Sequence, residues 1–269
     1  MSMKEFNALD GALLIDKPAG PTSHDIVDTV RQCYRIKKVG HCGTLDPAAT
    51  GLLTLLLGKA TKLSEKMMSD DKVYVGSMKL GETTNTFDAE GEIDETKPVP
   101  GLTLEALQEK ANDFLGDQLQ LPPMVSAIKI DGTPLYKLAR KGIEVERRKR
   151  FIHLYNFQIT EYEPPFAWFK VACTKGTYVR TLAHDLGQAL GCGAHLAGLR
   201  RTVSGKFKVS DATQLEELTS LSPGDLAKLE ERLAKLTNDA PLRTALGQAG
   251  RKLVEEEFTV EQLVERQYE

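Results

Sequence analysis

The sequence predicts an α+β fold. Segments in which polar and apolar residues alternate, as in β-strands, are mixed with segments in which apolar residues recur at helical spacing. The two kinds of segment do not alternate regularly along the chain, which disfavours a doubly wound parallel sheet. The 269 residues are enough to bury a sizeable core, either in one large domain or in one domain with a smaller module.

Strands are predicted at residues 12–15, 72–80, 151–160 and 168–174. The clearest alternation is in the second segment. There the even-numbered residues from Tyr74 to Leu80 are expected on one face, and the odd-numbered residues from Val73 to Lys79 on the other.

Helices are predicted at residues 23–36, 102–115 and 181–190. Pro21 and Ser23 are start signals for the first helix, in which apolar residues recur at helical spacing. Gly191 is typical of the residue that ends a helix, and it ends the third.

Residues 43–51 (GTLDPAATG) contain the most informative aspartate. Proline fixes its own φ and disfavours helical geometry in the residue before it, so Asp46 is predicted to lie in a turn. Gly43 and Gly51 allow close backbone approach on both sides. An aspartate placed in this way, near His41, can act as a nucleophile or general base toward a docked ligand. The alternative is that Asp46 and Pro47 begin a helix that runs into the apolar residues 52–57.

Residues 121–150 form an insertion that is interrupted by prolines and leads into a dense basic run. The run consists of Arg147, Arg148, Lys149 and Arg150. Basic runs on loops suit phosphate contacts, although such a run can also be an ordinary solvated surface.

Composition indicates a globular protein, with 41% hydrophobic and 27% charged residues. The chain has no apolar run long enough for a membrane span and no signal-like apolar core near Met1, so a cytoplasmic protein without membrane association is expected. The four cysteines are too scattered for a disulfide framework or a structural zinc site, and they are expected to be reduced: Cys33, Cys42, Cys173 and Cys192.

The net charge of −3 argues against an RNA partner only until its distribution is considered. Residues 211–269 carry −6 and residues 82–117 carry −8, which leaves the remainder of residues 1–210 at +11. That excess is enough for a basic surface if folding gathers it on one side.

Residues 39–53 (VGHCGTLDPAATGLL) closely resemble the signature of bacterial tRNA pseudouridine-55 synthases, in which the aspartate is the essential catalytic residue. Four further blocks match in the same order, at residues 11–24, 72–74, 175–187 and 195–202. The resemblance covers about residues 10–210. It implies the pseudouridine synthase fold, which has a central, largely antiparallel mixed sheet flanked by helices and an RNA-binding insertion. The catalytic domain is accordingly predicted at residues 1–210, with the insertion at about 121–150.

The resemblance implies isomerisation of a specific uridine to pseudouridine in the T-loop of tRNA, at position 55, without a metal or other cofactor. By the same resemblance Asp46 is the essential carboxylate and Arg180 pairs with it. Asp46 then attacks C1′, adds to the uracil ring or removes the 2′ proton, and the sequence leaves these routes open. For Arg180 the alternative is an ion pair with Asp185 along one helix.

Further roles follow from the resemblance alone. Tyr74 stacks on the extruded base and assists proton removal at C5, whereas its strand face equally allows a place in the core. Tyr178 and Leu199 are apolar walls of the same pocket, and His41 contacts the flipped nucleotide. Lys17 is interpreted as structural.

The insertion resembles the segment that these enzymes fold over the T-stem loop. One departure is visible, because this chain has Val125 where the family usually has an aromatic residue. The tRNA T-stem loop is the partner expected, and the protein is expected to be a monomer without an obligatory protein partner.

Residues 211–269 depart from the family's small β-rich RNA-binding module and are predicted to be a helical appendage. Residues 241–258 resemble the closing helices of nucleotide-sugar glycosyltransferases. Three functions are therefore compared. A tRNA pseudouridine synthase is favoured over a non-catalytic RNA-binding or RNA-folding module of the same fold, because Asp46, Tyr74 and Arg180 are intact. It is favoured over a glycosyltransferase because the chain lacks a glycine-rich nucleotide loop with its acidic partner.

Overall fold

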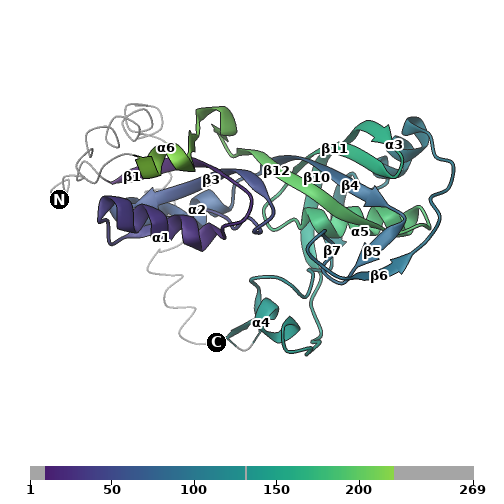
Figure 1. The fold of residues 1–269 in the computed structure, drawn as a ribbon, viewed down its shortest axis with the longest axis horizontal. Coiled ribbons are helices and arrows are strands. Elements are labelled where there is room, and N and C mark those ends of the chain that lie inside the picture. Colours follow the sequence, from purple (N-terminus) through teal and green to yellow (C-terminus); the bar gives the residue numbers. More distant parts are fainter. Residues whose placement is uncertain (1–9, 131, 221–269) are drawn as a thin grey trace, which may run out of the picture.

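A computed structural model describes residues 10–130 and 132–220 of the protein. A ten-stranded sheet runs through the body in the order β14-β1-β3-β12-β4-β11-β10-β7, with β2 paired to β3 and β13 paired to β12 (Figure 1). In this described part of the chain, only the β1–β14 and β3–β12 pairs are parallel. The sheet is therefore mixed and largely antiparallel, as the α+β prediction requires.

The elements at the left of Figure 1 come mostly from the N-terminal part of the chain. They are β1 (Gly11–Lys17), α1 (Ser23–Tyr34), β2 (Val39–His41), β3 (Thr50–Leu57), the 3-10 helix η1 (Gly58–Leu63) and α2 (Ser64–Met68).

The elements at the right of Figure 1 form the other half of the body. They are β4 (Lys72–Leu80), β5 (Glu82–Thr84), β6 (Ile93–Thr96), α3 (Leu104–Asn112), β7 (Gly116–Gln120), β10 (Arg150–Glu163), β11 (Phe166–Cys173) and α5 (Val179–Ala189).

The strand β12 (Ala194–Ser204) joins the two halves, because it pairs with β3 on one side and with β4 on the other. It is followed by β13 (Phe207–Lys208), the 3-10 helix η2 (Val209–Asp211), β14 (Thr213–Gln214) and α6 (Leu215–Ser220).

The start of α1 shows how the sequence fixes a helix end. Thr22 is the N-cap: its side chain accepts a hydrogen bond from the backbone N–H of Asp25, while the Asp25 carboxylate accepts one from the backbone N–H of Thr22. This capping box satisfies two N–H groups that the helix itself leaves unpaired. The cap is thus one residue before Ser23, the residue that the sequence suggested as a start signal.

The apolar segment 52–57 is a strand, so the alternative of a helix beginning at Asp46 is wrong. Leu53, Leu55 and Leu57 belong to the main core, whereas Leu52 and Leu56 belong to a second cluster on the opposite face of the sheet. Because β3 is covered on both faces, its sequence is continuously apolar rather than alternating.

The predicted strands and helices are all present, with ends that differ by a few residues. The largest difference is at residues 102–115, where α3 ends at Asn112. In β4, Tyr74, Met78 and Leu80 lie on one face as predicted and are buried, and Val73 and Val75 on the other face are partly exposed. The four cysteines form no disulfide, and Cys42, Cys173 and Cys192 are buried.

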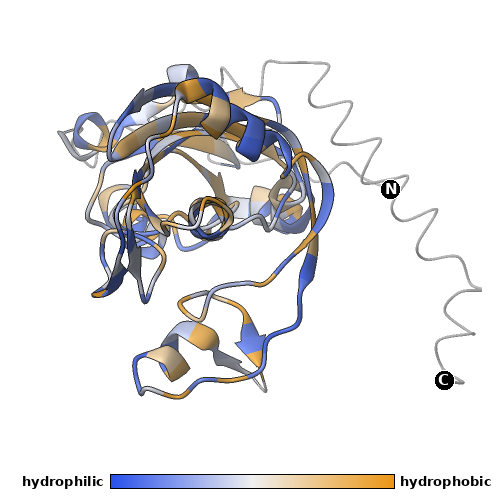
Figure 2. Ribbon diagram, turned by 90° about the vertical axis from the view of Figure 1, so that its right-hand side faces the viewer, coloured by the Kyte–Doolittle hydropathy of each residue, from blue (hydrophilic) through white to orange (hydrophobic). Residues whose placement is uncertain are grey.

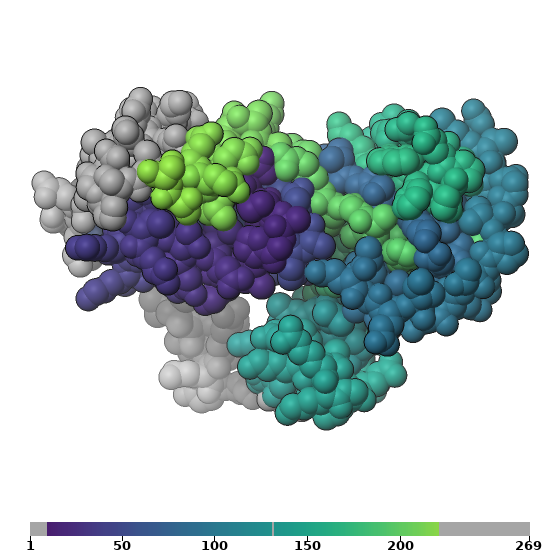
Figure 3. All heavy atoms as spheres, in the orientation of Figure 1, coloured from purple at the N-terminus to yellow at the C-terminus, as the bar shows by residue number. Residues whose placement is uncertain are grey.

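The insertion projects from the body as a small separate lobe (Figures 2 and 3). It consists of β8 (Lys129–Ile130), β9 (Thr133–Pro134) and α4 (Leu135–Ala139). It leaves the sheet after β7 and returns at β10, and these two strands pair with each other. Its attachment therefore lies at the edge of the main sheet.

Residues 211–220 of the predicted tail pack against the body. Thr213 and Gln214 add a parallel strand to β1, Leu218 is 1% exposed, and the Tyr34 hydroxyl donates a hydrogen bond of 3.0 Å to the Leu218 carbonyl. The boundary at residue 210 stays a prediction. The predicted stripes at 226–236 and 253–258, and the segment that resembles glycosyltransferases, lie outside the described residues. No helix within the described ranges is long and apolar enough to cross a membrane.

We expect a chain ending at residue 220 to fold, and a chain ending at residue 211 to lose about 3 kcal/mol in its free energy of unfolding. The shorter chain lacks the buried Leu218 side chain and the hydrogen bond from Tyr34. Urea titrations followed by circular dichroism measure the difference. Equal midpoints and slopes for the two chains would show that β14 and α6 contribute nothing to stability.

Candidate active site

The turn that carries Asp46 is held in one conformation by its two glycines and by a serine of α1. Gly43 and Gly51 have φ values of +99° and +96°, which favour glycine. A Cβ at Gly51 would lie 2.3 Å from the Arg201 carbonyl oxygen, so the close approach predicted for this glycine is real. The Ser23 hydroxyl donates to the Leu45 carbonyl and accepts from the Leu45 N–H, at 3.1 and 2.9 Å. Asp46 is thus positioned by its flanking residues on both sides.

Two buried cations lie beneath this turn. The Lys17 ammonium donates to the carbonyls of Pro18, Pro47 and Ala49 at 2.8, 3.0 and 2.8 Å. Arg201, 1% exposed, donates to the carbonyls of Leu52 and Gly43 at 2.7 and 3.1 Å. Within the described ranges, neither cation forms an ion pair with a carboxylate. Both cations therefore fix backbone carbonyls at or near the two ends of the turn, which supports the structural role predicted for Lys17.

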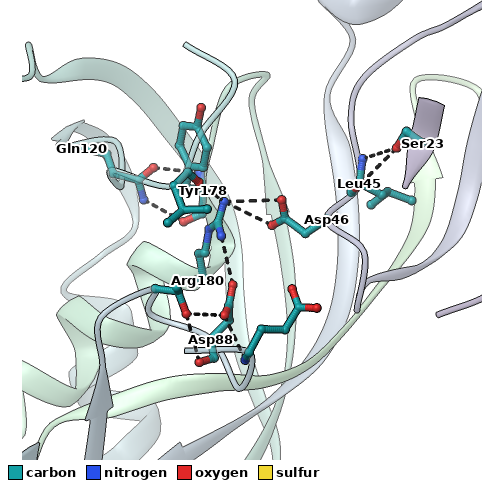
Figure 4. A network of polar contacts seen from close by, with 10 residues as sticks. Ser23, Leu45, Asp46, Asp88, Gln120, Tyr178 and Arg180 are labelled. Carbon is teal, nitrogen blue, oxygen red and sulfur yellow. Dashed lines mark hydrogen bonds and ion pairs between the residues drawn. The ribbon is translucent and has the colours of Figure 1, made fainter. Parts of the chain in front are cut away.

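The Arg180 guanidinium connects Asp46 to a second carboxylate (Figure 4). Its Nη2 lies 3.4 Å from both carboxylate oxygens of Asp46, and its Nη1 donates to Asp88 at 3.0 Å. Nη2 also donates to the Val125 carbonyl of the insertion at 2.6 Å. The predicted Asp46–Arg180 pair is present, and the alternative pair with Asp185 is not among the contacts of Arg180 in the part of the chain that the structure describes.

Asp88 lies in the loop between β5 and β6 and is 8% exposed. One carboxylate oxygen accepts from Arg180, and the other accepts from the Thr86 hydroxyl and the Glu90 N–H at 2.5 and 3.2 Å. The Thr84 hydroxyl donates to the Asp88 carbonyl at 2.7 Å. With both oxygens occupied, the Asp88 carboxylate cannot turn away from Arg180 without losing hydrogen bonds.

The first residues of α5 are fixed by a side chain from the end of β7. The Gln120 amide donates to the Tyr178 carbonyl at 3.1 Å and accepts from the Tyr178 N–H at 2.8 Å (Figure 4). Tyr178 is the N-cap of α5, and its ring lies 6.0 Å from the Arg180 guanidinium carbon. This pairing connects the base of the insertion to the helix that carries Arg180.

A cleft of about 930 Å³ opens between the body and the insertion. Asp46 and Arg180 line it together with Asp88 and Glu90. The opposite wall comes from the insertion and includes Met124, Val125, Tyr136, Arg140 and Ile143. The body side of the cleft is therefore charged and carries the predicted catalytic carboxylate, whereas the insertion side combines apolar residues and Tyr136 with Arg140 and Glu144.

Burial of the Asp46 carboxylate raises its pKa above the usual value, and the charge of Asp88 adds to the rise. Arg180 is the main group that opposes the rise, and Lys17 adds to its effect. The Asp46 side chain is nevertheless 41% exposed, so it is accessible from the cleft. The carboxylate is therefore reachable by a ligand, and its two cations oppose the rise in its pKa that burial causes.

Tyr74 is not among the residues that line the cleft, and 8% of its surface is exposed. Burial raises the pKa of Tyr74, and the Arg201 guanidinium opposes this rise by its charge and a hydrogen bond. Asp46 is near enough for its charge to raise the Tyr74 pKa slightly. Tyr74 therefore provides a neutral phenol at neutral pH, buried against the turn that carries Asp46.

His41 and Leu199 also lie beside the described cleft lining rather than in it. His41 ends β2, where burial lowers its pKa and Arg201 lowers it further. The histidine that lines the cleft is His24 of α1. Leu199 lies on β12 opposite Gly76, and it packs against the core.

The basic run at the base of the insertion has one member with a different role. Arg147 donates to the Pro122 carbonyl at 3.0 Å, and its side chain is 16% exposed. Arg148, Lys149 and Arg150 are exposed. Arg147 thus closes the base of the insertion, and the other three are free to meet a ligand.

Comparison with known proteins identifies the family. The model of the TruB family pseudouridylate synthase N-terminal domain matches residues 31–179, and that of the tRNA pseudouridylate synthase B C-terminal domain matches residues 180–238. The tRNA pseudouridine synthase B of Opitutus terrae is 53% identical over 233 residues, which cover 87% of this chain and 95% of that protein. The chain belongs to the TruB family of pseudouridylate synthases.

Other TruB relatives and solved structures agree. The tRNA pseudouridine synthase B of Syntrophotalea carbinolica is 45% identical over 87% of this chain and 76% of its own length. The crystal structure of a Cbf5-Nop10-Gar1 complex contains a chain that is 33% identical, with a TM-score of 0.62. That match covers 79% of this chain and 54% of the other. The predicted family, fold and class of enzyme, an isomerase that forms pseudouridine, are confirmed.

Three residues that shape this TruB site were not predicted from the sequence to do so. Asp88 lies in the acidic segment 82–117, where nothing distinguishes it from its neighbours. Gln120 and Arg201 act through backbone groups of residues that are 58 and 149 positions away. No local pattern carries such information. Among the residues described, no three His, Cys, Asp or Glu side chains are grouped to hold a metal ion.

Replacing Lys17 by methionine should lower the free energy of unfolding by about 3 kcal/mol, because it leaves the Pro47 and Ala49 carbonyls of the Asp46 turn and the nearby Pro18 carbonyl without their donor. The exposed Lys62→Met is the matched control and should change stability by less than about 0.5 kcal/mol. Chemical denaturation of the two variants measures both effects. Equal stabilities would show that the turn holds its shape without Lys17.

Proposed function

We propose that this TruB protein isomerises uridine 55 in the T-loop of tRNA, with Asp46 as the catalytic carboxylate. The observation that carries the proposal is the position of Asp46: it is open to a large cleft on one side and paired with the buried Arg180 on the other. Curated relatives over most of the chain's length are named tRNA pseudouridine synthase B, which supports tRNA as the substrate.

The isomerisation breaks the glycosidic bond of a uridine, turns the uracil and joins its C5 to C1′. Atoms and electrons balance within the nucleotide, since the proton lost from C5 is regained at N1. A positioned carboxylate is the one reactive group that this chemistry requires, and it must be ionised whether it attacks the sugar or the base or removes a sugar proton. Arg180 supports the ionised form of Asp46 and orients its two oxygens.

A uridine in a folded loop must leave the stack before it reaches Asp46. The cleft has room for an extruded nucleotide, and its apolar wall is formed by the insertion. We propose that the T-stem loop lies between the body and the insertion, and that Tyr74 and Leu199 form the deeper wall below the uracil. Arg148, Lys149 and Arg150 then face the phosphates of the stem. Because the substrate is tRNA, we propose that the protein acts in the cytoplasm.

Asp46→Asn should abolish pseudouridine formation and leave tRNA affinity within a few fold, because it removes the charge and keeps the volume. The conservative control Asp113→Asn changes an exposed carboxylate at the end of α3 and should be as active as the wild type. Pseudouridine is mapped in an unmodified tRNA transcript by carbodiimide treatment and reverse transcription. Turnover by the Asp46→Asn protein would refute the assignment. Retained binding by an inactive wild type would instead indicate an RNA-folding module.

Changing Arg148, Lys149 and Arg150 together to alanine should weaken tRNA binding and reduce the slope of log K against log salt by about two to three, since each phosphate contact contributes about 0.7 to 0.9. Filter binding between 50 and 200 mM salt gives the slope. The single variant Arg147→Ala is the comparison. It should leave the slope nearly unchanged and lower the stability of the protein, because the Arg147 guanidinium is hydrogen-bonded to the Pro122 carbonyl. An unchanged slope in the triple variant would assign the run to an ordinary solvated surface.

A further inference from the structure

Phe87 occupies a backbone conformation that its side chain disfavours. Its φ is +66°, and in the described part of the chain Arg35 at the end of α1 is the one other residue besides glycine with a positive φ. Its N–H donates to the Thr84 carbonyl at 3.1 Å, and its carbonyl accepts from the Leu196 N–H of β12 at 2.9 Å. A bulky residue in the left-handed region persists only where its surroundings hold it there.

The Phe87 side chain is held by a ring on α5. Its ring stacks on the imidazole of His184, with 3.9 Å between the ring centroids and 21° between the planes. The Nδ1 of His184 is buried without a hydrogen-bond partner within the described ranges. The stack with Phe87 is thus a contact that holds this imidazole. Burial lowers the pKa of His184, and the charge of Asp94 opposes this.

The loop between β5 and β6 touches α5 at two points that are one helical turn apart. His184 follows Arg180 by four residues, so the two side chains lie on the same face of the helix. The Phe87 ring stacks on His184. The next residue in the chain, Asp88, pairs with Arg180 at 3.0 Å. Adjacent loop residues thus contact adjacent positions on one face of α5.

We propose that the Phe87–His184 stack positions the active site: it holds residues 85–91 against α5 so that Asp88 reaches Arg180, and Arg180 in turn orients Asp46. Phe87 and His184 are positioning residues in this account, because they act through Asp88 and touch no substrate. The effect of the stack on the position of Asp88 follows from geometry alone. Its effect on the rate of isomerisation rests on the proposed function.

The pKa of Asp46 should therefore depend on whether the stack is intact. Asp46 faces Arg180 from α5, Lys17 from β1, and Asp88 and Glu90 from the β5–β6 loop. His24 of α1 and Arg140 and Glu144 of the insertion also line the cleft. If the stack is lost and Asp88 moves away, Arg180 pairs with Asp46 alone and a neighbouring negative charge is removed. The pKa of Asp46 then falls, as it must in Asp88→Asn.

The test compares Phe87→Ala, His184→Ala and Asp88→Asn with the double variant Phe87→Ala/Asp88→Asn, all in the full chain. Carboxyl ¹³C shifts of the free protein give the Asp46 pKa, with the resonance assigned by its loss in Asp46→Asn. Single-turnover rates on a T-stem-loop RNA are measured against pH. We expect Phe87→Ala and His184→Ala to lower the rate about 10- to 100-fold, as displacement of a catalytic group does. In both, the acid limb of the rate profile and the Asp46 pKa should move to lower pH, as in Asp88→Asn.

Two further variants separate positioning from general stability. His184→Phe keeps a ring for stacking and should retain the wild-type rate and acid limb, which also excludes titration of His184 as the cause. Phe87→Asn accepts the left-handed backbone without the ring and should behave like Phe87→Ala even if that variant folds poorly. The single-turnover rate of Phe87→Ala/Asp88→Asn should lie within about two-fold of that of Asp88→Asn, because both changes remove the same positioned group.

The inference is overturned if Phe87→Asn keeps the wild-type Asp46 pKa and rate, or if the effects of Phe87→Ala and Asp88→Asn multiply. A wild type that forms no pseudouridine would refute the proposed function instead. In that case the Asp46 titration still decides whether the stack positions Asp88.

Discussion

Arg180 is 5% exposed, and its guanidinium is shared by three segments that are distant in the sequence. It pairs with Asp46 of the catalytic turn and Asp88 of the β5–β6 loop, and it donates to the Val125 carbonyl of the insertion. A buried cation is costly unless carboxylates or other acceptors compensate its charge, so each of these segments must lie within reach of the guanidinium. The cleft therefore forms around one side chain. Because two carboxylates compete for it, the charge state of Asp46 depends on how closely Asp88 is held.

The turn that carries Asp46 depends on a second arrangement, in which buried cations bind carbonyl oxygens rather than carboxylates. Lys17 and Arg201 together hold five carbonyls at or near the two ends of the turn. Burial lowers the pKa of Lys17 to about 8, and the charge of Asp46 is the largest effect that opposes this. The lysine and the aspartate thus support each other's charged forms. This reciprocity provides a reason for a lysine, and not an apolar residue, beneath the turn.

The sheet brings these groups together through β12. This strand pairs in parallel with β3 next to the catalytic turn and antiparallel with β4 beside Tyr74. The parallel contact is short, at Arg200–Thr50 and Arg201–Gly51, and it requires the glycine at position 51 because a Cβ there would meet the Arg201 backbone. The glycine that flanks the Asp46 turn is therefore also the point where the two halves of the sheet join.

The sequence by itself determined the family, four of the strands (β1, β4, β10 and β11) and three of the helices (α1, α3 and α5). Local rules decide those elements, such as the alternation in β4 and the apolar spacing of the helices. The Asp46–Arg180 pair followed from family motifs in fixed order, whereas local geometry left open both a turn at Asp46 and a helix running into residues 52–57, and did not indicate β12. Only the tertiary structure decided that Asp88 shares Arg180, that Arg147 belongs to the base of the insertion, and that Tyr74 is buried and absent from the cleft lining. Each of these depends on which distant groups meet when the chain folds. The spacing of residues along the chain does not contain that information, because hydrogen bonds such as Arg201 to Leu52 join groups 149 positions apart.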